Sequence, residues 1–178
     1  IPKEERIGSV KIVLSTACFV PKPFTPFQWY GQDTYETFMA KHNKIRNSIT
    51  RRQVQFNHHD SKTSIIEAVI ARGDRKVADA IYEAYKSGCR FDSWSDYFEF
   101  DKWMLAFEKS NIDPGFYAYR HREYDEVLPW DHIDIGVTKE FLIRENEKAK
   151  KAKTTPHCRQ NCSNCGAREF NGGVCYED

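Results

Sequence analysis

The sequence of 178 residues lacks the features that mark membrane, exported or strongly charged proteins. It has no run of about 18 apolar residues, so no transmembrane helix is expected. Its first residues, Ile1 to Arg6, are charged and do not resemble a secretory signal. Because 27 basic residues nearly balance 26 acidic ones, bulk attraction to nucleic acid or to anionic lipid is unsupported. These absences favour a cytoplasmic protein with no membrane partner.

The pattern of apolar residues predicts an α/β fold. The run from Val10 to Val20 is β-branched and apolar, as in a buried strand, and Val54 to His58 forms a second, shorter candidate. A helix is expected between them, from Asp33 to Ser48. This spacing suits one parallel crossover unit, but two strands cannot form a stable parallel sheet alone. We therefore expect the remaining strands upstream, in a longer protein.

The rest of the chain is predicted to be mostly helical. Asp60 or Ser61 can cap one helix that breaks at Gly73, and Thr138 can cap another that runs to about Lys151. Two further helices are expected at 74–88 and 100–109. The turn at 72–75 reads Arg-Gly-Asp-Arg. Its charges could bind a phosphate or a carboxylate, but inter-helix salt bridges are the default interpretation.

A proline-rich aromatic loop follows the first strand. Three prolines between Pro21 and Pro26 exclude regular helix or sheet and leave a stiff loop carrying Phe24, Phe27 and Trp29. In barrels, loops at the carboxyl ends of strands build the active site. These rings would line a pocket or stack on an adenine, or else they would only cover the core.

Two histidine-containing segments are weaker site candidates. After the second strand come His58, His59 and Asp60, of which only His58 with Asp60, or His59 alone, can face one site. The competing interpretation makes Asp60 a helix cap.

In the second segment, His132 could form an acid–base pair with Asp131 or Asp134, although a structural loop is at least as well supported. We assign no catalytic residue.

Four of the six cysteines lie in the last 21 residues: Cys158, Cys162, Cys165 and Cys175. The spacing C-x3-C-x2-C with a fourth cysteine is typical of a thiolate site for zinc or for an iron–sulfur cluster. Unliganded thiols in a tail are the alternative. A site closed by four thiolates would be structural or electron-carrying.

Several long strings resemble one known family. They are VPKPFTPFQW (20–29), the His59-Asp60 pair, ARGDRKVADAIYEA (71–84), GCRFDSWSDYFEFDKWMLAF (88–107), IDPGFY (112–117) and LPWDHIDIGVTKEFL (128–142). The chain is similar in these strings to B12-binding-domain-containing radical S-adenosylmethionine (SAM) proteins, in the subgroup followed by a radical-SAM-linked domain. The resemblance extends to about Cys165.

The resemblance implies the C-terminal portion of a partial TIM-like barrel. Residues 1–60 would supply the last strands, 61–150 a helical extension, and 151–178 a linker with the cysteine tail. The upstream barrel, a cobalamin-binding domain before it and the radical-SAM-linked domain after it would be partners. Phe24, Thr25 and Phe27 would hold the adenosine of SAM. The family cleaves SAM to a 5′-deoxyadenosyl radical, and cobalamin-dependent methyl transfer often follows.

The chain departs from this pattern in one respect. The family motif for the SAM cluster is N-terminal, whereas the motif here is C-terminal and has Asn164 in place of the usual aromatic residue. The fragment alone is therefore expected to be inactive. The alternative function is a non-catalytic, zinc-knuckle-like module that binds RNA or protein.

Overall fold

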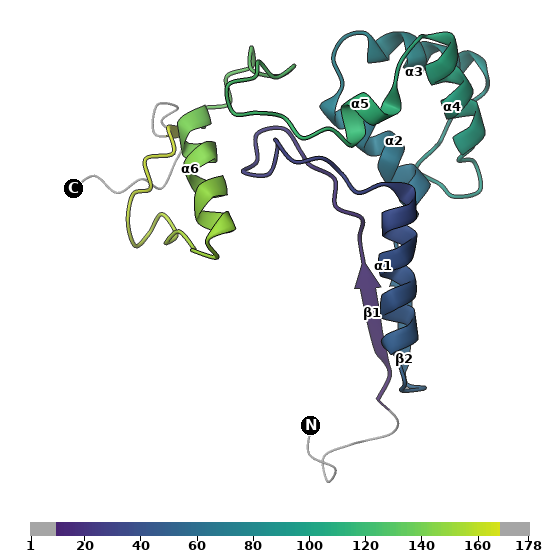
Figure 1. Cartoon of the computed structure of the whole chain (residues 1–178), viewed down its shortest axis with the longest axis horizontal. Helices are drawn as coiled ribbons and strands as arrows, with labels where there is room; N and C mark the ends of the chain where they lie inside the picture. The colour runs from purple at the N-terminus through teal and green to yellow at the C-terminus, as the bar shows by residue number, and fades with distance from the viewer. Residues whose placement is uncertain (1–9, 168–178) are drawn as a thin grey trace.

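The computed structural model describes residues 10–167 and begins with a parallel crossover unit (Figure 1). Strand β1 (Ile12–Thr16) is followed by α1 (Tyr35–Ser48) and β2 (Val54–His58). The strands pair in parallel, with Ile12 opposite Val54 and Thr16 opposite His58. The predicted mixture of helix and parallel strand is thus confirmed, while the described residues contain two strands and no closed barrel.

Strand β1 is shorter and more exposed than the sequence pattern predicts. It ends at Thr16, and Cys18 then turns inward, with its sulfur 3.5 Å from the Ser61 hydroxyl at the start of the next helix, α2 (Ser61–Arg72). Val13 is 58% exposed and Ile12 52% exposed, because β2 is the only strand beside them within residues 10–167. An apolar strand in this setting has one covered edge and little covered surface.

Four helices form a separate cluster at the carboxyl side of the strands (Figure 1). These are α2 (Ser61–Arg72), α3 (Val77–Lys86), α4 (Phe100–Lys109) and α5 (Pro114–Ala118). The first begins as predicted, since an Asp60 oxygen accepts a hydrogen bond from the Thr63 amide at 2.8 Å. The buried side chains of the cluster include Val69, Val77, Ala80, Trp103 and Phe107.

A second, smaller core joins the proline-rich loop to the last helix, α6 (Lys139–Lys150). Its buried members are Trp29, Leu128, Trp130 and Leu142. Thr138 caps α6 as predicted, by accepting a hydrogen bond from the Phe141 amide. No helix within residues 10–167 has the length and apolar content needed to cross a bilayer.

The Arg72 side chain is fully buried at the end of α2 and binds backbone oxygens. Its Nη1 donates to the carbonyls of Tyr117 (2.6 Å) and Ala118 (2.8 Å), and its Nη2 donates to that of Arg120 (2.8 Å). Burial, followed by the positive charges of Arg122 and Arg120, lowers the pKa of Arg72 to about 10. Instead of the inter-helix salt bridge expected for this turn, Arg72 makes hydrogen bonds to carbonyls at the end of α5.

A second buried guanidinium connects the two cores. Arg122 donates from Nη2 to the Arg72 carbonyl (2.7 Å) and from its backbone amide to the Trp29 carbonyl (2.8 Å). Its guanidinium lies over the Trp130 ring, 5.1 Å from the centroid. The helix cluster, the proline-rich loop and the second core are therefore held at one joint.

We predict that Arg72→Met lowers the free energy of unfolding by about 3 kcal/mol, because the carbonyls of Tyr117, Ala118 and Arg120 each lose a hydrogen bond from the guanidinium. Thermal and urea unfolding of the chain would measure this loss. Arg75→Met is the matched control, since Arg75 is exposed on the same turn. Equal losses in the two variants would contradict the role given to Arg72.

Candidate functional site

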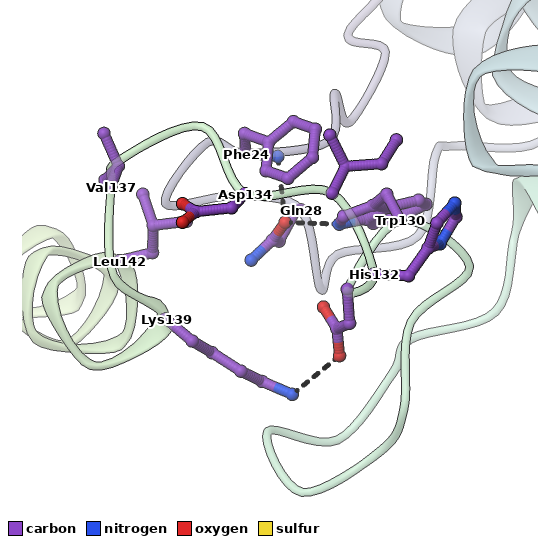
Figure 2. A pocket seen from close by; sticks show the side chains of 10 residues that line it. Phe24, Gln28, Trp130, His132, Asp134, Val137, Lys139 and Leu142 are labelled. Atoms are coloured by element: carbon purple, nitrogen blue, oxygen red, sulfur yellow. Dashed lines mark hydrogen bonds and ion pairs between the residues drawn. The ribbon is translucent and has the colours of Figure 1, made fainter. Parts of the chain in front are cut away.

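The proline-rich loop and a distant loop before α6 enclose one pocket of about 340 Å³ (Figure 2). The first loop leaves the carboxyl end of β1, and the second precedes α6. Apolar side chains and a charged rim both contribute to the lining, which consists of Phe24, Gln28, Trp130, Asp131, His132, Ile133, Asp134, Val137, Lys139 and Leu142. The structure thus joins two segments that the sequence marked separately.

Gln28 is the central polar group of the pocket and is only 2% exposed. Its Oε1 accepts hydrogen bonds from the Phe24 amide (2.9 Å) and from Trp130 Nε1 (2.8 Å), which bridges positions 102 residues apart. Among residues 10–167, Nε2 of Gln28 has no hydrogen-bond acceptor, and Figure 2 shows it on the side away from Trp130. The amide is held by its oxygen and leaves two N–H donors for a ligand.

Of the three residues expected to hold adenosine, only Phe24 lines the pocket. Phe24 has a φ of 58°, an unusual value for a residue with a side chain, and its ring forms one wall. Thr25 instead donates to the Lys22 carbonyl at 2.8 Å. Phe27 is 41% exposed and packs edge-on against Phe19.

The charged rim does not contain the acid–base pair considered for this loop. Asp131 accepts hydrogen bonds from the Leu128 amide (3.0 Å) and from Lys139 Nζ (3.2 Å). Asp134 uses one oxygen to accept from the Gly136 amide at 2.8 Å. His132 is exposed and lies on the opposite side of Gln28 from Asp134 (Figure 2). Both carboxylates therefore have partners other than His132, and within residues 10–167 neither is hydrogen-bonded to it.

The segment after β2 serves the fold. His58 stacks on His42 of α1, with ring centroids 4.1 Å apart, and burial is the main factor that lowers the pKa of His42. The Nδ1 of His59 lies 2.8 Å from the Ser64 hydroxyl. Because Asp60 caps α2, these side chains do not converge on one site, and the helix-cap interpretation is the one confirmed.

The described tail cysteines are not gathered into a ligand set. Cys158, Cys162 and Cys165 are free thiols, the first two of them exposed, and Cys175 lies outside the described residues. Within residues 10–167, no group of three or more His, Cys, Asp or Glu side chains is placed to hold a metal ion. We therefore derive no chemical step through a metal at this tail.

The end of the described tail contacts the wall of the pocket. The Thr138 amide donates to the Cys165 carbonyl at 2.9 Å, and Arg144 donates to the Ser163 carbonyl. Gly166 has a φ of 97°, and a Cβ there would lie 2.7 Å from the Gly136 carbonyl oxygen. The cysteine segment therefore packs on the same turn that carries Val137 and Lys139 into the pocket.

Comparisons of the chain with protein-family models, with curated proteins and with solved structures find no match. Sequence reasoning missed Gln28 and Lys139. The only signal for Gln28 was a polar residue between two aromatic ones, Phe27 and Trp29.

We predict that Gln28→Leu lowers the free energy of unfolding by about 2 kcal/mol, because two buried donors lose their acceptor. The Trp130 environment should change as well, which tryptophan fluorescence would detect alongside thermal unfolding. Gln55→Leu, on the exposed side of β2, is the control. A Gln28→Leu variant as stable as the control would refute the structural role of this amide.

Proposed function

We propose that the chain is the C-terminal segment of a radical SAM iron–sulfur enzyme, with the pocket at the mouth of its active site. The supporting observation is that two of the strings that resemble this family, 20–29 and 128–142, supply the two walls of the pocket. One wall is the loop that leaves the carboxyl end of a parallel strand. Ligands of parallel α/β proteins bind at that end of the strands.

The residues of the pocket are suited to binding and orienting a ligand. Phe24 and Trp130 offer flat apolar surfaces to a ring, and the Nε2 of Gln28 offers donors to a ring nitrogen or a carbonyl. The second oxygen of Asp134 can accept from a hydroxyl or an amine. We propose that Phe24 contacts the adenosine or the substrate, whereas Thr25 and Phe27 act only through the shape of the loop.

The reaction itself would come from bound groups. When bound, the SAM cluster and SAM supply the 5′-deoxyadenosyl radical, and cobalamin would support a methyl transfer. The chain's own part is to hold the ligand and to exclude water with its apolar wall. The absence of an acid–base pair among the described pocket residues is compatible with this division of roles.

The exposed strand β1 supports the proposed partners. Ile12, Val13 and Leu14 are apolar residues that a lone strand pair leaves 39–58% exposed. We propose that strands of an upstream barrel in the same protein cover them, with the B12-binding domain before that barrel and the radical-SAM-linked domain after this chain. Burial of such residues is worth about 25 cal/mol for each Å² of apolar surface.

A second candidate function rests on the tail. Exposed free thiols at C-x3-C-x2-C spacing suit zinc or an iron–sulfur cluster, and Cys165 is already fixed through its carbonyl. We propose metal binding by Cys158, Cys162, Cys165 and Cys175. If the metal is zinc, a zinc-knuckle-like binding module becomes the favoured function of the tail.

The enzymatic proposal is tested with the protein encoded by the complete gene, purified and reduced without oxygen. We expect 5′-deoxyadenosine to form from SAM, as measured by chromatography and mass spectrometry. Phe24→Ala should reduce the rate at least about tenfold, equivalent to 1.4 kcal/mol of lost binding or orientation. Phe116→Ala, at a half-exposed ring on α5, is the control. If the complete protein forms no 5′-deoxyadenosine, the proposal fails.

The tail is tested by metal and sulfide analysis of the anaerobically purified chain, with a visible spectrum. Iron with sulfide and a broad brown absorbance, lost in Cys158→Ser, would establish a cluster. Zinc without colour, lost in the same variant, would establish the knuckle. Ser163→Ala is the control, because Arg144 contacts only the backbone of that residue. Stoichiometric metal that survives Cys158→Ser would remove the tail from both functions.

A further inference from the structure

Three large aromatic side chains are exposed on the loop that joins α3 to α4. Figure 1 shows the course of this loop between the two helices. In this aromatic loop, residues 91–97, Phe91 is 67% exposed, Trp94 61% and Tyr97 60%. Residues on both sides of the loop are instead directed inward, since Cys89 is buried and Phe98 packs against the helix core. Neighbouring exposed apolar side chains are a feature of interaction surfaces, and Trp and Tyr are among the residues that dominate binding energy at interfaces.

The aromatic loop has a compact backbone held by its own hydrogen bonds and ring contacts. Its backbone forms two consecutive turns, with hydrogen bonds from Trp94 to the Phe91 carbonyl (2.9 Å) and from Tyr97 to the Trp94 carbonyl (3.0 Å). The Phe91 ring packs edge-on against Trp94 and Tyr97, at centroid distances of 6.0 and 6.1 Å. Little conformational entropy would therefore be lost when the loop is bound.

The charge around the aromatic loop is negative, unlike that of the chain as a whole. Residues 90–102 carry four carboxylates and two basic side chains, whereas the whole sequence has a net charge of +1. Lys102 is paired with Glu99, and within residues 10–167 no ion pair neutralises Asp92, Asp96 or Asp101. This charge disfavours a phosphate backbone and favours a basic partner.

Rings next to the aromatic loop already bind cations of the chain itself. Arg90 lies 4.8 Å from the centroid of the Tyr85 ring, and Lys86 lies 4.9 Å from that of Tyr82. Within the described residues, the three rings of the aromatic loop have no such cation. Their electron-rich faces are therefore available to positive groups of another molecule.

We propose that the aromatic loop is a docking surface for a basic segment of a partner protein. Arginine side chains of that segment stack on Trp94 and Tyr97 and pair with Asp96. The arrangement matches the strongest features of protein interfaces, in which Trp, Tyr and Arg dominate the binding energy. This surface carries none of the pocket or tail residues, so the proposal does not depend on the proposed enzyme or metal functions.

The test is fluorescence titration of the whole chain with a dye-labelled short peptide of alternating arginine and glycine, near physiological salt. We expect saturable binding that Trp94→Ala weakens by at least about tenfold and that Asp96→Lys weakens similarly. Val127→Ala and Asp125→Lys are the controls, because both residues are exposed and lie outside the aromatic loop. Both loop positions are exposed, so all four variants should unfold at the same temperature as the parent chain.

The same variants test two other binding partners of the aromatic loop, a nucleic acid and a second copy of the chain. Tighter binding of a labelled oligouridylate than of the peptide, abolished by Trp94→Ala, would replace the basic partner with a nucleic acid. Dimerisation that Trp94→Ala abolishes, measured by sedimentation, would replace it with a second copy of the chain. Peptide binding that the controls weaken as much as the loop variants, or that no variant weakens, would overturn the proposal.

Discussion

The structure depends on two buried guanidinium groups that satisfy the open ends of helices. A helix leaves its last carbonyls without intrahelical donors, and α5, with five residues, has almost no interior turn. Arg72 supplies three donors to the chain at the end of α5, and Arg122 returns one to the carbonyl of Arg72 at the end of α2. Removing a guanidinium from water is costly, and at Arg72 three carbonyl contacts offset that cost without a carboxylate partner. Arg122 offsets less of it, since its Nε and Nη1 have no hydrogen-bond partner within residues 10–167. The backbone amide of Arg122 also donates to the Trp29 carbonyl, so the proline-rich loop that forms one wall of the pocket is attached at the same joint.

Local signals predicted local structure well. The caps at Asp60 and Thr138, the break at Gly73 and the end of α3 before Gly88 follow from side chains within a few residues of each boundary. The helix expected to start at residue 74 begins three residues later, at Val77, because the Asp74 carboxylate accepts from the Lys76 amide in the turn before it. The length of β1 was overestimated, since the apolar run continues past Thr16 but Cys18 turns toward α2. The burial of Arg72 depends on carbonyls 45 to 48 positions away and left no local pattern to detect.

The composition of the sequence identified the two loops that form the walls of the pocket, but it did not predict that these loops lie side by side. Prolines and aromatic residues identified the first loop, and a Trp with charged neighbours identified the second. What joins them is one amide oxygen, that of Gln28, which accepts from both loops. A single glutamine carries no periodicity, so its role becomes visible only when the two loops are seen together (Figure 2). The position of Phe24 was also not predictable from a pattern. Its left-handed backbone directs the ring into the pocket, which the adjacent Thr25 does not line.

The hydrogen bond between the Thr138 amide and the Cys165 carbonyl would reduce the conformational entropy lost when the tail thiolates gather around a metal. A flexible chain loses conformational entropy for every sulfur that must be brought to a common centre. Here the last cysteine of the C-x3-C-x2-C motif is held by its own carbonyl, and Arg144 holds the residue two positions before it. Within this motif, Cys158 and Cys162 would then be the two that still have to be positioned, over a short segment that starts at the end of α6. Part of the ordering needed to collect thiolates is thus completed by the fold, on the same turn that shapes the wall of the pocket.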